Sequence, residues 1–295
     1  MIVGASGKAL GIKVTNSFLK RQDEFNLSIL ISKESMKNEE KKRIFQDFQK
    51  QGAKLIEGEL DDPIGLEKAL QGIDIVICLL TGNDQKVLFN GQKSLIEASK
   101  KAHVKRFITS DYGMELSRIK ENECHYYKPK QEIQKLLEQD SSIEHTFIAT
   151  GLFADFLFTP YFGIDLKQRK IQFFGPSNMK ISTTYSNDIA LLLPDIILLE
   201  ECKNARIDLA SFTTTFNEIY EIAQQMTGQS FEFIENQSYQ NLTSEQLYEQ
   251  VSEFVKSVYA RGDGFFEKPF NKIHPKLSKI QTTTIEDLIK MKINE

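Results

Sequence analysis

Strand-like and helix-like segments alternate along the first half of this chain, and the alternation limits the folds open to it. Apolar runs predict strands at residues 1–3, 27–31, 53–56, 74–80, 105–110 and 145–150. Amphipathic segments predict helices between them, at residues 8–20, 38–52, 62–71, 84–102 and 130–139. Strands joined by helix-length segments form βαβ units with right-handed crossovers. The sequence therefore predicts an α/β fold, a doubly wound parallel sheet whose ligand lies beyond the carboxyl ends of the strands.

The alternation stops near residue 150, where a second region begins. Residues 151–162 are apolar and rich in phenylalanine, and residues 171–182 have the pattern of a hairpin with its turn at 175–178. Later patterns predict helices at 187–199, 216–227 and 244–259 and strands at 206–209 and 231–234. We expect residues 206–209 to join the main sheet. The sequence thus predicts a domain over residues 1–150 and a smaller α+β lobe over residues 151–295, partly interwoven with it.

Charge and composition exclude several classes of protein. The 295 residues include 37 Lys and Arg against 41 Asp and Glu, which gives a net charge of −4. A charge so close to balance does not indicate a surface that binds nucleic acid or a membrane. No apolar run reaches the ~18 residues that span a bilayer. The three cysteines (Cys78, Cys124 and Cys202) and the four histidines have no metal-ligand spacing. We expect buried thiols in a reducing, cytoplasmic location, and no metal.

A glycine-rich turn, from Gly4 to Gly11, connects the first predicted strand to the first predicted helix. Glycines let the backbone approach a pyrophosphate, and the N-terminus of a helix favours its negative charge. The glycines stand at positions 4, 7 and 11, and a plain turn between two core elements is the alternative interpretation. If the turn binds a dinucleotide, the predicted cofactor-binding residues are Gly4, Ser6, Gly7, Lys8 and Gly11, with Thr81 after the fourth strand.

The second predicted strand is followed by Ser32-Lys33-Glu34-Ser35. In a dinucleotide-binding sheet this strand end meets the adenosine ribose, where a basic residue pairs with the 2′-phosphate of NADP and an acidic residue accepts from the 2′-hydroxyl of NAD. We therefore predict that Lys33 selects NADP, with Ser35 as a further donor. A solvated surface lysine is the alternative, and Glu34 leaves NAD open as the less favoured cofactor.

Three residues beyond the fifth strand have side chains suited to proton transfer: Ser110, Tyr126 and Lys130. A Tyr-x-x-x-Lys pair on one helix face would let the ammonium lower the pKa of the phenol, which could then exchange a proton with a carbonyl oxygen. Ser110 could hold that oxygen. Pro129 lies inside the pair and is tolerated only in a first turn, so Tyr126 could instead precede the helix. Chance occurrence is the alternative for so short a motif.

Several blocks of the sequence resemble the NmrA-like, isoflavone-reductase-like family of atypical short-chain dehydrogenase/reductases. The turn Gly4-Ala5-Ser6-Gly7 resembles the phosphate loop of that family. The two more specific blocks are Gly58-Glu59-Leu60-Asp61-Asp62 with Leu66 through Ile77, and Gln92 through Gly113, which contains Lys105-Arg106-Phe107 and Ser110-Asp111-Tyr112-Gly113. The resemblance continues in Arg261-Gly262-Asp263, His274-Pro275 and residues 282–288, and so covers nearly the whole chain.

The resemblance implies a Rossmann-like NADP-binding domain and a smaller substrate-binding lobe, with the active site between them. Lys130 falls at the position of the family's active-site lysine, which acts as general acid/base while the nicotinamide delivers hydride. Lys33 matches the basic residue for the 2′-phosphate, and Phe153 falls near an aromatic residue on the nicotinamide side.

The sequence departs from the family pattern at three places. Leu10 holds the third glycine position of the loop, and Gly11 comes one residue late. The first strand has only three residues, which leaves open whether further residues precede Met1. Tyr126 is not typical of the isoflavone-reductase branch.

These observations predict an NADPH-dependent reductase of a small apolar or aromatic carbonyl or enone, with Lys130 as general acid/base. The phenylalanine-rich segment could line the substrate pocket or belong to ordinary core; its members are Phe153, Phe156, Phe158 and Phe162. The alternative is a noncatalytic sensor that binds NADP(H) and passes its redox state to a protein partner, as in NmrA-like regulators. The sequence leaves the substrate and the oligomeric state open.

Overall fold

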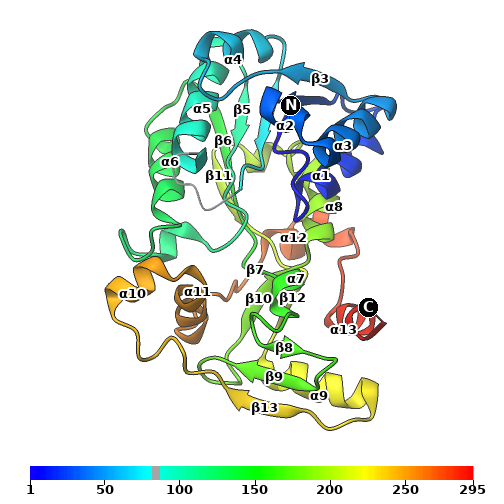
Figure 1. Cartoon of the computed structure of the whole chain (residues 1–295), viewed down its shortest axis with the longest axis vertical. Helices are drawn as coiled ribbons and strands as arrows, with labels where there is room; N and C mark the ends of the chain where they lie inside the picture. The colour runs from blue at the N-terminus through cyan, green and yellow to red at the C-terminus, as the bar shows by residue number, and fades with distance from the viewer. Residues whose placement is uncertain (82–86, 295) are drawn as a thin grey trace. The chain divides into compact units, whose positions relative to one another are not determined.

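The computed structural model describes residues 1–81 and 87–294 (Figure 1). The chain divides into two compact units, each made of three segments. The first unit contains Met1–Asp111, Pro129–Ile148 and Ile189–Ile207, and the second contains Tyr112–Lys128, Ala149–Asp188 and Asp208–Glu295. The chain passes from one unit to the other close to the predicted boundary at residue 150, and also at 111/112, 128/129, 188/189 and 207/208. The cofactor-binding and substrate-binding roles of the two predicted domains stay predictions.

A seven-stranded sheet forms the centre of the first unit, in the order β11-β6-β5-β4-β1-β2-β3. The strands are β1 (Ile2–Val3), β2 (Ser28–Ile31), β3 (Lys54–Glu57), β4 (Ile75–Cys78), β5 (Arg106–Ile108), β6 (Glu144–Ala149) and β11 (Ala205–Asp208). The pairings of β1 with β2 and β4, of β2 with β3, of β4 with β5 and of β5 with β6 are parallel. The strand order reverses at β1, so the sheet is doubly wound, and the predicted Rossmann-like fold is confirmed.

Helices follow the strands of the first unit, as the sequence predicts. They are α1 (Gly11–Leu19), α3 (Glu39–Lys50), α4 (Pro63–Ala69), α5 (Gln92–Lys101) and α6 (Lys128–Glu138), with a π-helical turn at Val87–Gly91 before α5. A further helix, α8 (Ser186–Ile196), lies mostly in this unit and precedes β11. The predicted start of the 84–102 helix lies outside the described residues. Asp62 caps α4 by accepting from the N–H of Gly65 at 3.0 Å, and Pro63 begins the helix, where its missing N–H is harmless.

A short helix that the sequence interpretation missed, α2 (Lys33–Lys37), follows β2 directly. Ser32 and Ser35 form a capping box at its start: each side chain accepts from the backbone N–H of the other residue, at 3.1 Å. Serine at both capping positions favours a helix start, so the strand end runs into a helical turn and not into an open loop.

The core of the first unit is made of strand and helix side chains that are fully removed from water. Ile2, Val76 and Phe107 are completely or almost completely buried in the sheet, and Leu66 and Leu95 pack from α4 and α5. Burying each such side chain stabilises the fold by about 1.5–3 kcal/mol. The central strands are buried along their length, which agrees with the continuous apolar run predicted for a covered parallel strand.

The second unit contains two three-stranded sheets, in the orders β12-β10-β7 and β13-β9-β8. Their strands are β7 (Leu152–Phe153), β8 (Ile164–Asp165), β9 (Lys170–Phe173), β10 (Ile181–Thr184), β12 (Phe212–Thr214) and β13 (Glu232–Glu235). The hairpin predicted over 171–182 is wrong, because β9 and β10 belong to different sheets. The turn residues at 175–178 carry the chain from one sheet to the other, and local pattern alone does not show which strands then pair.

The helices of the second unit are α7 (Ala154–Leu157), α9 (Phe216–Thr227), α10 (Ser244–Glu249), α11 (Val251–Ala260), α12 (Phe270–Ile273) and α13 (Ile285–Asn294). Gly228, with φ of +65°, ends α9 as predicted. The single helix predicted at 244–259 is wrong, since the chain leaves helical geometry at Gln250. Among the residues that the structure describes, no helix has the length and apolar character needed to cross a membrane.

Polar side chains connect the C-terminal segments of the second unit to its strands. The hydroxyl of Tyr259, in α11, accepts from the N–H of Leu152 and donates to the carbonyl oxygen of Ser182 at 3.3 Å. The amide of Asn271 bonds to both backbone groups of Ala210, at 3.0 and 2.9 Å. All these groups are buried, so the second unit depends on side-chain hydrogen bonds between distant parts of the sequence.

Candidate functional site

The glycine turn between β1 and α1 has no room for side chains at two positions. Gly4 has φ of +88°, and its carbonyl oxygen accepts from the N–H of Gly7 at 3.1 Å. A Cβ on Gly4 would lie 2.6 Å from the carbonyl oxygen of Leu79, and a Cβ on Gly11 would lie 2.2 Å from that of Gly4. Both contacts are with backbone atoms, so a side chain would have to move the main chain.

Gly11 is the first residue of α1, and Leu10 precedes it as the N-cap residue. The third glycine of a dinucleotide-binding turn allows the helix to approach the strand closely. Gly11 makes that approach here, one position later than in the family pattern, while Leu10 is buried. The turn therefore fits a dinucleotide: it is closely packed glycine backbone at the carboxyl end of a central strand, and it leads into a helix N-terminus.

Lys33, the first residue of α2, is flanked by two carboxylates that the sequence interpretation missed. Its Nζ lies 3.5 Å from Oε1 of Glu57, and its N–H donates to Oε1 of Glu59 at 2.7 Å. The Ser35 hydroxyl donates to the carbonyl oxygen of Ser32 at 2.7 Å, so a phosphate would have to compete with this bond. The pairing of β2 with β3 is the signal that could have found Glu57, since it lies opposite Ile31.

Lys8, in the glycine turn, points its ammonium at α3. Its Nζ lies 2.8 Å from Oε1 of Glu40, and both side chains are largely exposed. The hydrogen bond from Lys8 holds the pKa of Glu40 below its usual range. An exposed pair of this kind is weak, so it does not prevent Lys8 from meeting a phosphate.

Lys130 is buried on α6, and its Nζ donates to the main-chain oxygen of Asp111 at 2.8 Å. Ser110, the residue before Asp111, donates its N–H to Oε1 of Gln92 at 2.9 Å and its hydroxyl to the oxygen of Leu80 at 2.5 Å. These residues follow β5 and β4 at their carboxyl ends, where a doubly wound sheet binds its ligand. The structure thus brings Lys130 into contact with the segment after β5 that contains Ser110 and Asp111.

A buried hydrogen-bond network supports this segment. Oδ2 of Asp111 accepts from the Thr109 hydroxyl at 2.5 Å and from Nε2 of Gln134 at 2.7 Å, and Oε1 of Gln134 accepts from Arg206 at 2.6 Å. Gln134 is four residues after Lys130, so both lie on one face of α6. The sequence interpretation missed Asp111 and Gln134, and the only signal for Gln134 was this spacing.

The remaining predicted site residues do not belong to this cluster. Tyr126 precedes α6, which begins at Lys128, so the same-face geometry of a helical Tyr-x-x-x-Lys pair does not apply. Its ring packs edge-on against Tyr127 within the second unit, at 5.2 Å between centroids. Phe153 lies in β7 and stacks on Phe156 at 5.9 Å. Thr81 is exposed and is the last residue described before Val87. Their predicted roles stay predictions.

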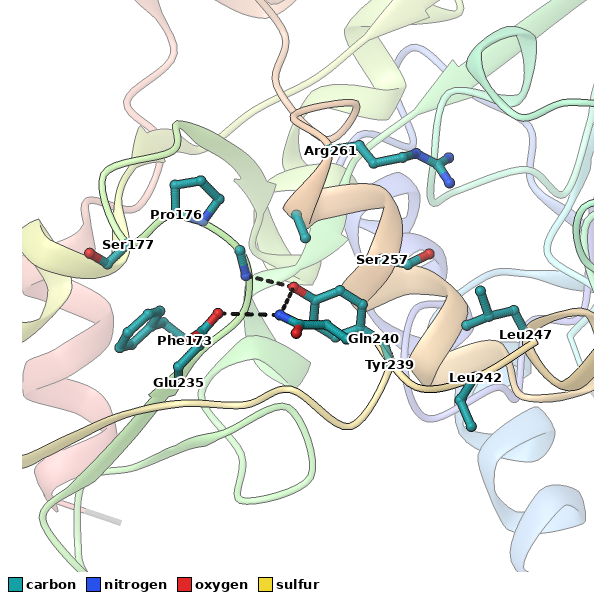
Figure 2. A pocket seen from close by; sticks show the side chains of 12 residues that line it. Phe173, Pro176, Ser177, Glu235, Tyr239, Gln240, Leu242, Leu247, Ser257 and Arg261 are labelled. Carbon is teal, nitrogen blue, oxygen red and sulfur yellow. Dashed lines mark hydrogen bonds between the residues drawn. The ribbon is translucent and has the colours of Figure 1, made fainter. Parts of the chain in front are cut away.

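A groove of about 710 Å³ opens in the second unit (Figure 2). It is lined by Phe173, Gly175, Pro176, Ser177, Glu235, Tyr239, Gln240, Leu242, Leu247, Ser257, Ala260 and Arg261. The four phenylalanines predicted as possible pocket residues are not among them, and Phe158 and Phe162 lie in the hydrophobic core.

Two polar side chains of the groove, Tyr239 and Gln240, bond to other groups that line it. The Tyr239 hydroxyl accepts from the N–H of Gly175 at 3.0 Å, and Nε2 of Gln240 donates to Oε1 of Glu235 at 3.3 Å (Figure 2). These bonds fasten the loop that contains Tyr239 to the strand ends beside it. We therefore assign Tyr239, Gln240 and Glu235 a structural role.

The cysteines have the properties of core thiols. Cys78, Cys124 and Cys202 are all buried and unbridged, and burial raises the pKa of their thiols to about 12, 11 and 11. A thiol with so high a pKa is a poor nucleophile and a poor metal ligand at neutral pH. Within residues 1–81 and 87–294, no cluster of three or more His, Cys, Asp or Glu side chains could hold a metal ion.

Comparison with known proteins identifies relatives over one half to nine tenths of the chain. The isoflavone reductase homolog A622 of Nicotiana glauca is 26% identical over 282 residues, which cover 89% of this chain and 86% of that protein. The bifunctional pinoresinol-lariciresinol reductase of Linum usitatissimum is 32% identical over 163 residues, which cover 51% and 50% of the two chains.

The solved structures show the same fold. The complex of leucoanthocyanidin reductase with NADPH from Vitis vinifera superposes with a TM-score of 0.79 at 19% identity, over 100% of this chain and 99% of that one. The model of the NmrA-like family matches residues 1–289. This match covers nearly the full length of the chain, and it agrees with the doubly wound sheet, the glycine turn and the lysine beyond β5 described above. The chain therefore belongs to the NmrA-like family.

Proposed function

We propose that this protein is an NADPH-dependent reductase of a small apolar or aromatic carbonyl or enone. The observation that carries the proposal is Lys130, a buried lysine whose Nζ is held at 2.8 Å by the Asp111 carbonyl oxygen just beyond β5. The relatives named as reductases and the structure named as an NADPH complex support the reaction type and the cofactor.

The glycine turn and the residues after β2 are the proposed cofactor site. Gly4, Ser6, Gly7, Lys8 and Gly11 would hold the pyrophosphate, with Lys33 and Ser35 at the adenosine ribose. NADPH, when bound, supplies a hydride, and the protein supplies orientation and a proton.

Lys130 is the proposed proton donor and acceptor. Its hydrogen bond to the Asp111 carbonyl fixes the position of Nζ, so the ammonium is oriented before a substrate arrives. A positioned acid of this kind contributes about 10²–10⁴-fold to a rate. Ser110 would hold the substrate oxygen by exchanging its bond to Leu80, and Tyr126 and Phe153 are proposed as further contacts to substrate and nicotinamide.

The test replaces Lys130 by alanine and measures NADPH binding and NADPH oxidation separately. We expect Lys130→Ala to bind NADPH within about threefold of the wild type and to lose turnover by about 100-fold or more over a panel of enones and aromatic carbonyls. Lys135→Ala, an exposed lysine on the same helix, is the matched control and should leave both unchanged.

Undiminished turnover in Lys130→Ala would remove the lysine from the mechanism. Tight NADPH binding by the wild type without turnover of any compound in the panel would favour the sensor hypothesis.

A further inference from the structure

The end of the proposed cofactor site that meets the adenosine ribose contains charges of both signs. Lys33 supplies the positive charge, and Glu57 supplies a negative charge 3.5 Å from its Nζ. The sheet places them together because Ile31 of β2 and Glu57 of β3 are paired residues, and Lys33 begins α2 two residues after Ile31. A basic residue at this strand end favours NADP, and an acidic residue favours NAD.

The backbone around Lys33 is held firmly. Its N–H donates to the Glu59 carboxylate at 2.7 Å, and the N–H of Gly58 donates to the carbonyl oxygen of Ile31 at 3.0 Å. These two bonds tie the end of β2 to the end of β3. The lysine Cα therefore stays beside Glu57 whatever the side chain contacts.

The pair between the two side chains is weak by comparison. The Lys33 side chain is 71% exposed and that of Glu57 is 60% exposed, so water screens their attraction. A phosphate with more charge than a carboxylate can therefore replace Glu57 as the partner of Lys33. The replaced carboxylate would remain close to the phosphate and repel it.

We propose that Glu57 is a specificity-determining residue: by pairing with Lys33 it weakens the preference for a 2′-phosphate, so that the site accepts NADH as well as NADPH. This inference rests on the proposed function. NADPH must displace Glu57 from Lys33 and then lie next to its charge. NADH has a neutral 2′-hydroxyl that meets neither obstacle and that a carboxylate can accept from.

The expected change in nucleotide affinity is that caused by one exposed charge. A single like-charge contact at this degree of exposure changes an affinity by about three- to tenfold. We therefore expect the wild type to bind NADPH and NADH with affinities that differ by about tenfold or less, and the difference to depend on Glu57.

The experiment titrates NADPH and NADH into the full chain and follows the nicotinamide fluorescence, which requires no substrate. We expect Glu57→Gln to tighten NADPH binding by about three- to tenfold and to leave NADH binding unchanged or weaker. Lys33→Met should weaken NADPH about tenfold and leave NADH within about twofold. The matched control is Glu39→Gln, which removes the same charge from the neighbouring helix α3, where Glu39 lies 3.9 Å from Lys42.

The outcomes separate the inference from the proposed function. An unchanged NADPH-to-NADH ratio in Glu57→Gln would overturn the inference while both nucleotides still bind. Equal tightening of NADPH binding by Glu39→Gln and Glu57→Gln would also overturn it, because the effect would then be one of net charge. If neither nucleotide binds to the wild type, the proposed function fails, and the role of Glu57 fails with it.

Discussion

Within each of the two units, a different kind of hydrogen bond connects the segments of the chain. In the first unit, seven neighbouring strands bond directly through their main chains. In the second, buried side chains bond C-terminal residues to earlier parts of the chain, as Tyr259 does to Leu152 and Asn271 to Ala210. A strand ladder needs only apolar residues in the correct period, whereas a side-chain bond needs one particular residue. We therefore expect the first unit to be sensitive to backbone crowding and the second to single polar substitutions.

The largest effect on stability should come from adding one methyl group to the glycine turn between β1 and α1. Gly11→Ala would place Cβ 2.2 Å from the carbonyl oxygen of Gly4, so strand and helix must separate. We expect the free energy of unfolding, measured in urea, to fall by about 3 kcal/mol, and NADPH binding to be lost. Gly7→Ala is the matched control, since its Cβ meets the same oxygen at 3.3 Å and should cost less than half as much. Equal losses would show that packing against Gly4 does not hold this turn.

A smaller but still large effect should follow the loss of one hydroxyl in the second unit. Tyr259→Phe leaves the buried N–H of Leu152 without that acceptor, and we expect the free energy of unfolding to fall by about 2 kcal/mol. Tyr161→Phe makes the same change at an exposed ring and should cost almost nothing. A Tyr259→Phe protein as stable as the wild type would remove the contrast between the two units.

One place in the first unit depends on polar side chains as the second unit does, and that place is the candidate site. Gln134→Leu removes the donor to Asp111 and the acceptor for Arg206. Because Asp111 holds Lys130, we expect kcat for NADPH oxidation to fall about tenfold with KM nearly unchanged. Gln139→Leu, at the exposed end of the same segment, is the control. Equal activity in the two variants would show that Gln134 does not position Lys130.

The smallest predicted effect is a pH dependence in the first unit. Burial lowers the pKa of His145, whose ring stacks on Phe147 at 4.6 Å. The unfolded state therefore takes up a proton more readily than the folded state, so stability is full above the unfolded pKa of about 6.5 and falls as the pH drops below it. Between pH 7.5 and 5.5, we expect the free energy of unfolding of the wild type, measured in urea, to fall by about 1 kcal/mol more than that of His145→Leu. His103→Asn, an exposed histidine, should behave as the wild type.

Much of the first unit could be predicted from the sequence, and less of the second. Strands such as Ile75–Cys78 are buried on both faces, and their apolar runs are visible without any knowledge of partners. The failed hairpin shows the limit: Ile171 and Ile181 both lie in strands, yet they do not pair with each other. Ile171 pairs with Ile164 and Phe233, and Ile181 pairs with Thr214. Local pattern predicts a strand but does not predict its neighbour.

The candidate site, like the fold, could be predicted only in part. Glycines and a lysine beyond β5 could be predicted because each reflects a local requirement or a family motif. The local pattern around Gln134 and Glu57 did not reveal them, because a polar residue on a helix or at a strand end looks the same whether it faces water or a partner. Only the pairing of two strands that are separate in the sequence could have indicated Glu57. The roles of these two residues depend on Arg206 and Lys33, which lie far away in the sequence.

The sheet order has a consequence for how the chain is made. The strand next to β6 is β11, and it leaves the ribosome only after all of β7 to β10 has been synthesised. Until Ala205–Asp208 emerges, the backbone of β6 is an open edge that another nascent chain could pair with. A truncated product that stops near residue 150 should therefore aggregate, and expression of the first unit alone would require residues 189–207 to be grafted back.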